Sequence, residues 1–320
     1  MRKNLFSLAF TLGLMAFTST AYPQAASGQN LRLVAPWAAG GGADILARMI
    51  APLLQKELGQ TVIVENRPGA SGNIGAEQVA RSPADGNTLM VTSGNLMMNP
   101  SVFKSVQYDP IADFTPVTML TFAPVLLVKG PRTAAKDLRE LLVAIRAKPG
   151  QFNYSTSGRA GTPHLAGEMF RINQNINITH IPYNGAAPAL ADVAGGQVEL
   201  SFTAYLSARS LIEAGRVQPL AVAGKRRLAA LPNVPTFAEQ GVDLEIGVMI
   251  GLFAPAKMPK DVTERIYRAV TRALGTPEFR QRISDSGAEV VLNKPEDFAA
   301  YVREDVAKWK ALIPKMGGLE

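Results

Sequence analysis

Short apolar runs alternate with amphipathic segments along this chain, and glycine-rich turns separate the two. Short apolar runs are typical of buried strands, and the N-terminal part has such runs over 31–35, 61–64 and 88–92. Apolar positions 45, 49, 53 and 54 share one face of a helix predicted over 44–58, which Gly59 ends. Parallel strands joined by helices need both faces covered, so the pattern predicts an α/β sheet with function in the loops after its strands.

The rest of the chain repeats this alternation. We predict strands over 124–129, 152–155, 179–182, 199–203 and 219–223, and helices over 134–147, 161–170, 188–194 and 208–214. Towards the C-terminus apolar residues recur every four positions from Val262 to Leu274, and Thr276 with Pro277 begins another helix. The length of 320 residues suits two domains of about 150 residues each.

The composition argues against catalysis and against metal or nucleic-acid binding. The chain has no cysteine, which excludes a disulfide scaffold, a thiolate nucleophile and a cysteine zinc site. Its two histidines, His164 and His180, stand apart from carboxylates at ligand spacing, and we interpret them as structural. No nucleotide-binding glycine motif or G-x-S-x-G elbow occurs, and basic residues do not cluster with aromatic ones. We therefore expect no cofactor, no metal and no nucleic-acid partner.

The first 26 residues are predicted to be an export signal. Arg2 and Lys3 precede an apolar run from Leu5 to Phe17, and the small residues Ser19 and Ala21 indicate cleavage near 21–26. The run is shorter than the roughly 20 residues that span a bilayer, although a membrane anchor is the alternative.

The remaining candidate chemistry lies in small-residue loops, each between a strand and a helix. A helix N-terminus presents unpaired N–H groups and a partial positive charge, so such loops bind carboxylates without lysine or arginine. Glycine and alanine let a ligand oxygen approach the backbone closely. Several such loops, in two sets of strands and helices, predict a carboxylate-binding cleft.

Two of these segments, Pro36–Asp44 and Glu65–Gly75, closely resemble the receptors of tripartite tricarboxylate transporters, the Bug-type solute-binding proteins. Further matches, in the right order over the mature chain, are Asp85-Gly86, Gly161–Leu165, His180–Gly185, Gly195–Val198 and Gly251–Pro255. The resemblance implies two α/β domains joined by crossover strands, a Venus flytrap that closes on a small carboxylate in the periplasm. It also implies delivery of that ligand to a membrane permease, and we expect a monomer.

The family pattern implies the domain limits and the ligand contacts. Domain one is expected at 28–122 plus 248–320 and domain two at 123–247, with crossings near Thr121–Ala123 and Val248–Gly251. The implied contacts are Trp37, Ala38, Ala39, Ala70, Ser71, Thr92 and Ser93 in domain one, and Ser155, Ser157, Gly158, Thr162 and Asn184 in domain two. Asp44 and Thr203 complete the candidate site. The family often carries an acid where Thr203 stands, so its loss favours an anion without an amine.

Several alternatives stay open at this point. Asp44 is either a ligand contact or a carboxylate that the start of its own helix favours. Ser155 and Ser157 either contact ligand or cap the next helix. At the level of function, the rivals are a ligand sensor that docks a membrane kinase and a secreted hydrolase that uses a loop serine.

Overall fold

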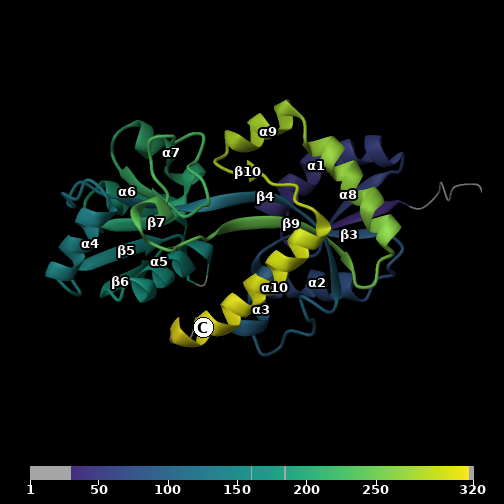
Figure 1. Ribbon diagram of the computed structural model, residues 1–320, viewed down its shortest axis with the longest axis horizontal. Helices are drawn as coiled ribbons and strands as arrows, with labels where there is room; N and C mark the ends of the chain where they lie inside the picture. The colour runs from purple at the N-terminus through teal and green to yellow at the C-terminus, as the bar shows by residue number, and fades with distance from the viewer. Residues whose placement is uncertain (1–29, 160, 184, 317–320) are drawn as a thin grey trace, which may run out of the picture.

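A single sheet runs through the whole molecule. The computed structural model describes residues 30–159, 161–183 and 185–316, so the predicted export signal and Asn184 lie outside the described residues. The strands are β1 (Leu31–Ala35), β2 (Val62–Asn66), β3 (Thr88–Ser93), β4 (Phe114–Lys129), β5 (Phe152–Thr156), β6 (Ile178–Pro182), β7 (Leu200–Ala204), β8 (Gln218–Val222), β9 (Gly247–Pro255) and β10 (Glu289–Val290). Their order is β2-β1-β3-β9-β4-β7-β5-β6, with β8 and β10 each paired to β4. The helices gather in two groups along this continuous sheet, and each group forms a lobe with the part of the sheet that it covers (Figure 1).

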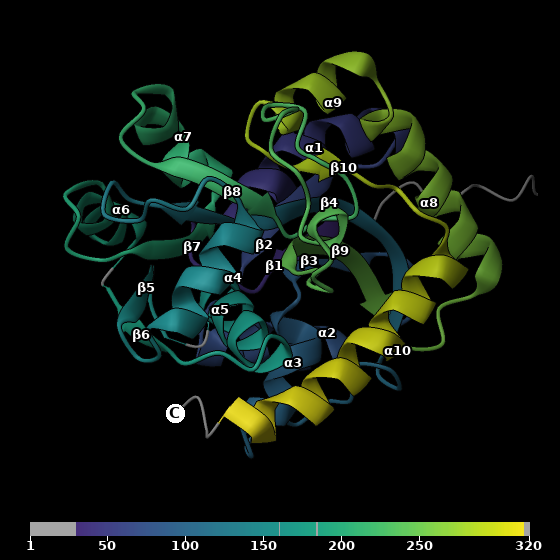
Figure 2. The same ribbon diagram turned by 60° about the vertical axis from the view of Figure 1, so that its left-hand side comes forward.

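Lobe one contains the first strands of the chain and its last helices. β1 pairs in parallel with β2 and β3, and β9 lies antiparallel beside β3. The helices of this lobe are α1 (Gly42–Leu58), α2 (Asn73–Ala80), α3 (Asn95–Val102), α8 (Lys260–Leu274), α9 (Pro277–Ser284) and α10 (Pro295–Leu312). α10 crosses the lobe and packs beside α3 (Figure 2).

Lobe two is built from the middle of the chain. β5 pairs in parallel with β6 and β7, while β7 and β8 both lie antiparallel to β4. The helices of this lobe are α4 (Leu138–Ala147), α5 (Thr162–Asn173), α6 (Ala186–Ala194) and α7 (Tyr205–Glu213). Both lobes therefore place the carboxyl ends of parallel strands next to helix N-termini, as the sequence pattern predicted.

The two lobes share one long strand. The first part of β4 pairs with β9 as far as Pro124 opposite Gly247, and its last part pairs with β7 from Val125 opposite Ala204. The strand thus leaves one lobe and enters the other without a break in its extended backbone.

The α/β prediction is confirmed, with three differences in detail. β4 begins ten residues before the predicted strand over 124–129, and α3 was not predicted. The α1 prediction begins two residues late and is only partly right about the buried face: Leu54 is buried as predicted, but Ile45 is 52% exposed whereas Leu46 and Ile50 are buried. The buried face is centred on Leu46, Ile50 and Leu54, and Met49 and Leu53 of the predicted stripe pack at its edge. Among the described residues, no helix is long and apolar enough to cross a bilayer.

Candidate functional site

The loop after β1 is organised from inside by Asp44. Its carboxylate, on a residue only 2% exposed, accepts hydrogen bonds of 2.8 Å from the Gly40 N–H and from Asn66 Nδ2. Arg48, one turn further along α1, pairs with the same carboxylate at 2.9 Å. Burial opposes ionisation, but the hydrogen bonds from Gly40, Asn66 and Arg48 outweigh it and lower the pKa of Asp44. The carboxylate is therefore charged and already engaged within its own loop.

Trp37, at the head of this loop, carries a buried donor. Its indole Nε1 is inaccessible and has no hydrogen-bond partner among the described residues. The ring lies against Gly72 of the next loop, where an added Cβ would stand 3.4 Å from Cζ2. Ala38 and Ala39 follow and are exposed just before α1 begins. This loop therefore offers backbone and small side chains rather than a charged group.

The loop after β2 has an unusual backbone. Four successive residues have positive φ: 134° at Gly69, 46° at Ala70, 56° at Ser71 and 91° at Gly72. The left-handed conformation costs a residue with a Cβ about 1–2 kcal/mol, so Ala70 and Ser71 store strain at the start of α2. Both residues are exposed, and within the described part of the chain their N–H groups donate to no protein acceptor.

The loop after β3 combines one buried and one accessible hydroxyl. Thr92 is 3% exposed within the sheet, opposite Gly251 of β9. Ser93 is half-buried, and its hydroxyl donates to Asn95 Oδ1 at 3.0 Å.

Lobe two presents a Ser/Gly loop after β5. Ser155 is fully buried and its hydroxyl donates to the Ala189 carbonyl at 3.2 Å, so it joins β5 to α6. Ser157 is exposed, Gly158 half-buried, and Thr162 begins α5. The backbone of Ser157 is fixed by the Gly185 N–H, which donates to its carbonyl at 3.2 Å.

Thr203 is a buried residue of the sheet rather than of this loop. It is 4% exposed and sits within β7, opposite Leu126 of β4.

The two histidines of the chain stack on each other beneath this loop. The ring centroids of His164 and His180 are 3.8 Å apart with 14° between their planes, and Tyr154 stacks on His180 at 5.0 Å. His180 Nε2 lies 2.7 Å from Thr156 Oγ1, and the Thr156 hydroxyl donates to the Gly158 carbonyl at 2.7 Å. Burial and the neighbouring His164 lower the pKa of His180 to about 4, so the pair is uncharged at neutral pH.

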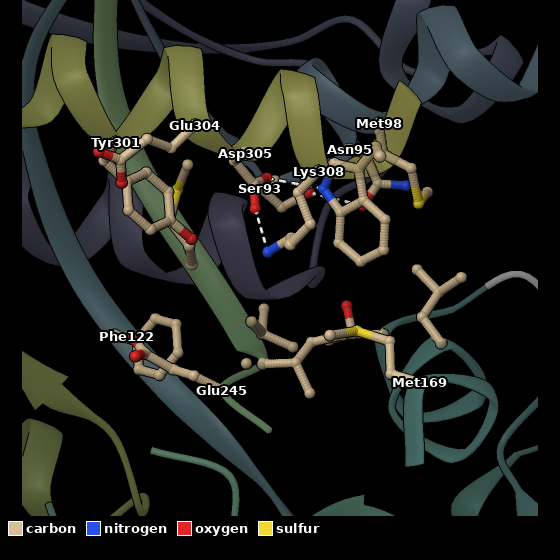
Figure 3. Close-up of a pocket in the computed structure, with 18 of the residues that line it drawn as sticks. Ser93, Asn95, Met98, Phe122, Met169, Glu245, Tyr301, Glu304, Asp305 and Lys308 are labelled. Carbon is tan, nitrogen blue, oxygen red and sulfur yellow. Dashed lines mark hydrogen bonds and ion pairs between the residues drawn. The ribbon is translucent and has the colours of Figure 1, made fainter. Parts of the chain in front are cut away.

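A cavity of about 320 Å³ lies between the lobes (Figure 3). One wall is α10, where Asp305 accepts from Trp309 Nε1 at 2.7 Å and pairs with Lys308. Met169 of α5 and Glu245 lie across the cavity from α10. The predicted site residues that line it are Ser93 and Thr162. Because carboxylates and aromatic rings dominate its α10 wall, this part of the interlobe space suits an anion poorly.

The structure thus separates the sequence-predicted residues into accessible and buried groups. The accessible or partly accessible ones are Trp37, Ala38, Ala39, Ala70, Ser71, Ser93, Ser157, Gly158 and Thr162; the buried ones are Asp44, Thr92, Ser155 and Thr203. Sequence reasoning missed the α10 wall, the histidine stack and the buried Asn99 of α3, whose Nδ2 donates to the Ser71 carbonyl at 3.0 Å. In α10, Asp305 one turn before Trp309 is a sequence signal for the buried polar pair that these two residues form.

Comparison with known proteins decides the family. Residues 46–318 match the model of the "Tripartite tricarboxylate transporter family receptor". The chain belongs to this family. The resemblance inferred from the loop sequences is therefore confirmed, and with it the two-lobed receptor fold.

Three solved receptors of this type show how the fold recurs. A TctC solute-binding protein from Polaromonas, without ligand, is 27% identical, with 90% of this chain and 99% of that one covered and a TM-score of 0.83. Rpa4515 from R. palustris, with adipate, is 33% identical over 91% and 98% of the two chains, with a TM-score of 0.72. MatC from Rhodopseudomonas palustris, with bound malate, is 31% identical over 89% and 99%, with a TM-score of 0.69.

Proposed function

We propose that this receptor is exported to the periplasm, captures a small organic carboxylate between its lobes without converting it, and delivers it to the permease of a tripartite tricarboxylate transporter. The observation that carries the proposal is the structure of the loops before α1 and α2. Buried Asp44 and Asn99 use their own polar groups to hold these loops. Just before α1 and α2, this leaves exposed alanine and serine whose N–H groups donate to no acceptor among the described residues.

The proposed ligand contacts follow from this separation of buried supporting residues from exposed loop residues. Trp37, Ala38, Ala39, Ala70, Ser71 and Ser93 would face the ligand from lobe one, and Ser157, Gly158, Thr162 and Asn184 from lobe two. Asp44, Thr92, Ser155 and Thr203 are buried, and we assign them to positioning rather than to direct contact. We propose that the lobes divide at 122/123 and 247/248, within two residues of the point between Pro124 and Val125 where β4 changes partners.

The ligand is proposed to be an anion without an amine, such as a dicarboxylate or an aromatic acid. The relatives with adipate and malate support a diacid. Backbone N–H groups at helix starts favour carboxylates, whereas an ammonium group in this loop region would find Asp44 already engaged by Gly40, Asn66 and Arg48.

The lobes are proposed to close on the ligand. The ligand-free Polaromonas receptor has the higher TM-score at the lower sequence identity, while the receptors with adipate and malate match less well in shape. This order of TM-scores supports an open arrangement of the two lobes in the present structure. Ligand would then select a closed arrangement by contacting both lobes.

A hydrolase that uses a loop serine is less well supported. His180 Nε2 is engaged by Thr156, and no hydrogen bond joins the exposed Ser157 to His180 within the described residues. A nucleophilic serine needs a base within hydrogen-bond reach.

The deciding experiment identifies the ligand and its fate. Protein purified without denaturation is unfolded, and the released small molecule is identified by mass spectrometry. Calorimetry then compares adipate, malate, citrate, benzoate and glutamate. A receptor returns the bound acid unchanged with one-to-one stoichiometry. A product that accumulates with time, or tightest binding of glutamate, would contradict the proposal.

A further inference from the structure

The left-handed turn at Ala70 and Ser71 is tied to the interior by one side chain. Asn99 of α3 is 1% exposed, and its Nδ2 donates both to the Ser71 carbonyl at 3.0 Å and to Asn73 Oδ1 at 2.6 Å. Tyr108 also donates to Asn73 Oδ1, at 3.1 Å. The buried polar cluster thus joins α3, the start of α2 and the loop that precedes α2.

The orientation of the Asn99 amide follows from its surroundings. Its NH₂ group faces two acceptor oxygens, those of Ser71 and Asn73, while its own Oδ1 is buried and has no partner among the described residues. The reversed orientation would place Oδ1 against both acceptors and repel them. The site therefore needs a donor at this position, and no acceptor can substitute for it.

We propose that Asn99 is a positioning residue that holds Ala70 and Ser71 in their strained conformation for ligand capture. The inference rests on the proposed function, since it concerns the same loop. A planar peptide directs the Ser71 carbonyl towards Asn99 and the following N–H of Gly72 the opposite way, where it donates to the Gly69 carbonyl at 3.0 Å. The turn closed in this way leaves the N–H groups of Ala70 and Ser71 free for an anion.

The test compares variants that remove the donor with one that removes the strain. Asn99→Ala should raise the amide exchange rate of the peptide over 67–74 about tenfold in ligand-free protein and weaken adipate binding by a similar factor, as loss of one buried donor implies. Adding Ala70→Gly should recover most of the affinity, because glycine adopts positive φ without cost. Asn175→Gly relieves a φ of 47° remote from the site and should recover nothing.

Asn99→Asp gives a second, isosteric readout. Its carboxylate would face the two acceptors, so adipate binding should be weak at pH 8 and improve as the pH falls and the carboxyl becomes protonated and able to donate. The unmodified protein should show no such improvement. This variant, and the double variant with Ala70→Gly, keep the test decisive where Asn99→Ala does not fold.

The outcomes separate the two proposals. Unchanged exchange over 67–74 in folded Asn99→Ala overturns the positioning role, as does faster exchange with unchanged adipate affinity. A failure of the unmodified protein to bind adipate counts against the proposed function for this diacid, while the exchange measurement still decides whether Asn99 holds the turn.

Discussion

The two lobes present similar loops to the space between them but support these loops with different chemistry. In lobe one, the ionised carboxylate of Asp44 and the amide of Asn99 hold the loops, and neither group changes charge near neutral pH. In lobe two, Thr156 holds the Ser/Gly loop and is itself bonded to His180 of the histidine stack. The loops of the two lobes should therefore differ in their sensitivity to acid, because those of lobe one depend on a charged carboxylate and those of lobe two on neutral imidazoles.

The largest effect is expected from Asp44→Ala in lobe one. The substitution leaves the Gly40 N–H without its acceptor, and Asn66 Nδ2 keeps only the Trp37 carbonyl at 3.0 Å. These losses should lower the free energy of unfolding by about 2–4 kcal/mol. Urea unfolding measures this. Glu213→Gln, in the exposed pair with Arg209 at 2.8 Å, is the matched control and should cost less than about 0.5 kcal/mol. Equal losses in the two variants would contradict the role given to Asp44.

Lobe two should respond most to crowding of Tyr154. A Cβ at Gly167 would lie 2.2 Å from Tyr154 Cε2, and this fully buried ring stacks on His180 and donates to Glu168 Oε1 at 2.7 Å. Gly167→Ala should therefore cost about 1–3 kcal/mol. Gly94→Ala is the control, since its Cβ would meet only a flexible methionine carbon at 3.8 Å. Thermal unfolding of the two variants provides the comparison.

The histidine stack should make stability depend on pH. The folded pKa of His180 is about 4, below its ordinary value of 6.5, so the unfolded chain binds the proton more readily between these values. The contribution is complete above pH 6.5 and is lost as the pH falls towards 4. Because His180 is partly exposed, we expect a loss of about 1–2 kcal/mol, less than the full shift would imply.

The neighbours of the histidine stack determine how its pH dependence is measured. They are Tyr154 of β5, Arg159 of the loop, and Glu168 of α5. Glu168 has a lowered pKa and adds a loss only below its ordinary value of 4.5. His180→Gln should make the curve shallower between pH 6.5 and 4.5, and the lowered pKa of His164 accounts for the slope that remains. An unchanged slope in that variant would assign the effect to other groups.

The smallest effect on stability is expected from Ser157→Ala. Its hydroxyl is exposed, and the bond that fixes its backbone, from the Gly185 N–H, survives the change. Unfolding free energy should stay within about 0.5 kcal/mol. Binding of the carboxylate should nevertheless weaken about three- to tenfold if the hydroxyl contacts the ligand. Calorimetry with adipate and malate tests this; equal affinity would remove Ser157 from the proposed contacts.

The sequence predicted the parallel strands and their helices because local apolar patterns determine them. α3 escaped prediction because its segment contains Asn95, Asn99 and Pro100, and it is the burial of Leu96 to Met98 that stabilises it. The first part of β4 pairs with β9, more than a hundred residues away, which no local pattern reveals.

The sequence predicted which loops form the candidate site, but not which of their side chains are exposed to ligand and which are buried and position the loops. Local sequence shows that Asp44 precedes an apolar helix, but not that three donors converge on its carboxylate. Asn99 looks like a surface residue in the sequence, because its partners Ser71 and Asn73 lie in another element.

The continuity of β4 has a mechanical consequence for the proposed closure. A flexible linker would let two lobes move freely, but a strand hydrogen-bonded on both sides resists bending and returns to its rest shape. Its register with β9 shifts between Pro116 and Thr118 and between Met119 and Thr121, which marks compliant points along an otherwise stiff element. β4 would then bend elastically and store energy when ligand closes the lobes. The energy stored in that bend would lower the affinity for ligand and speed its release to the permease.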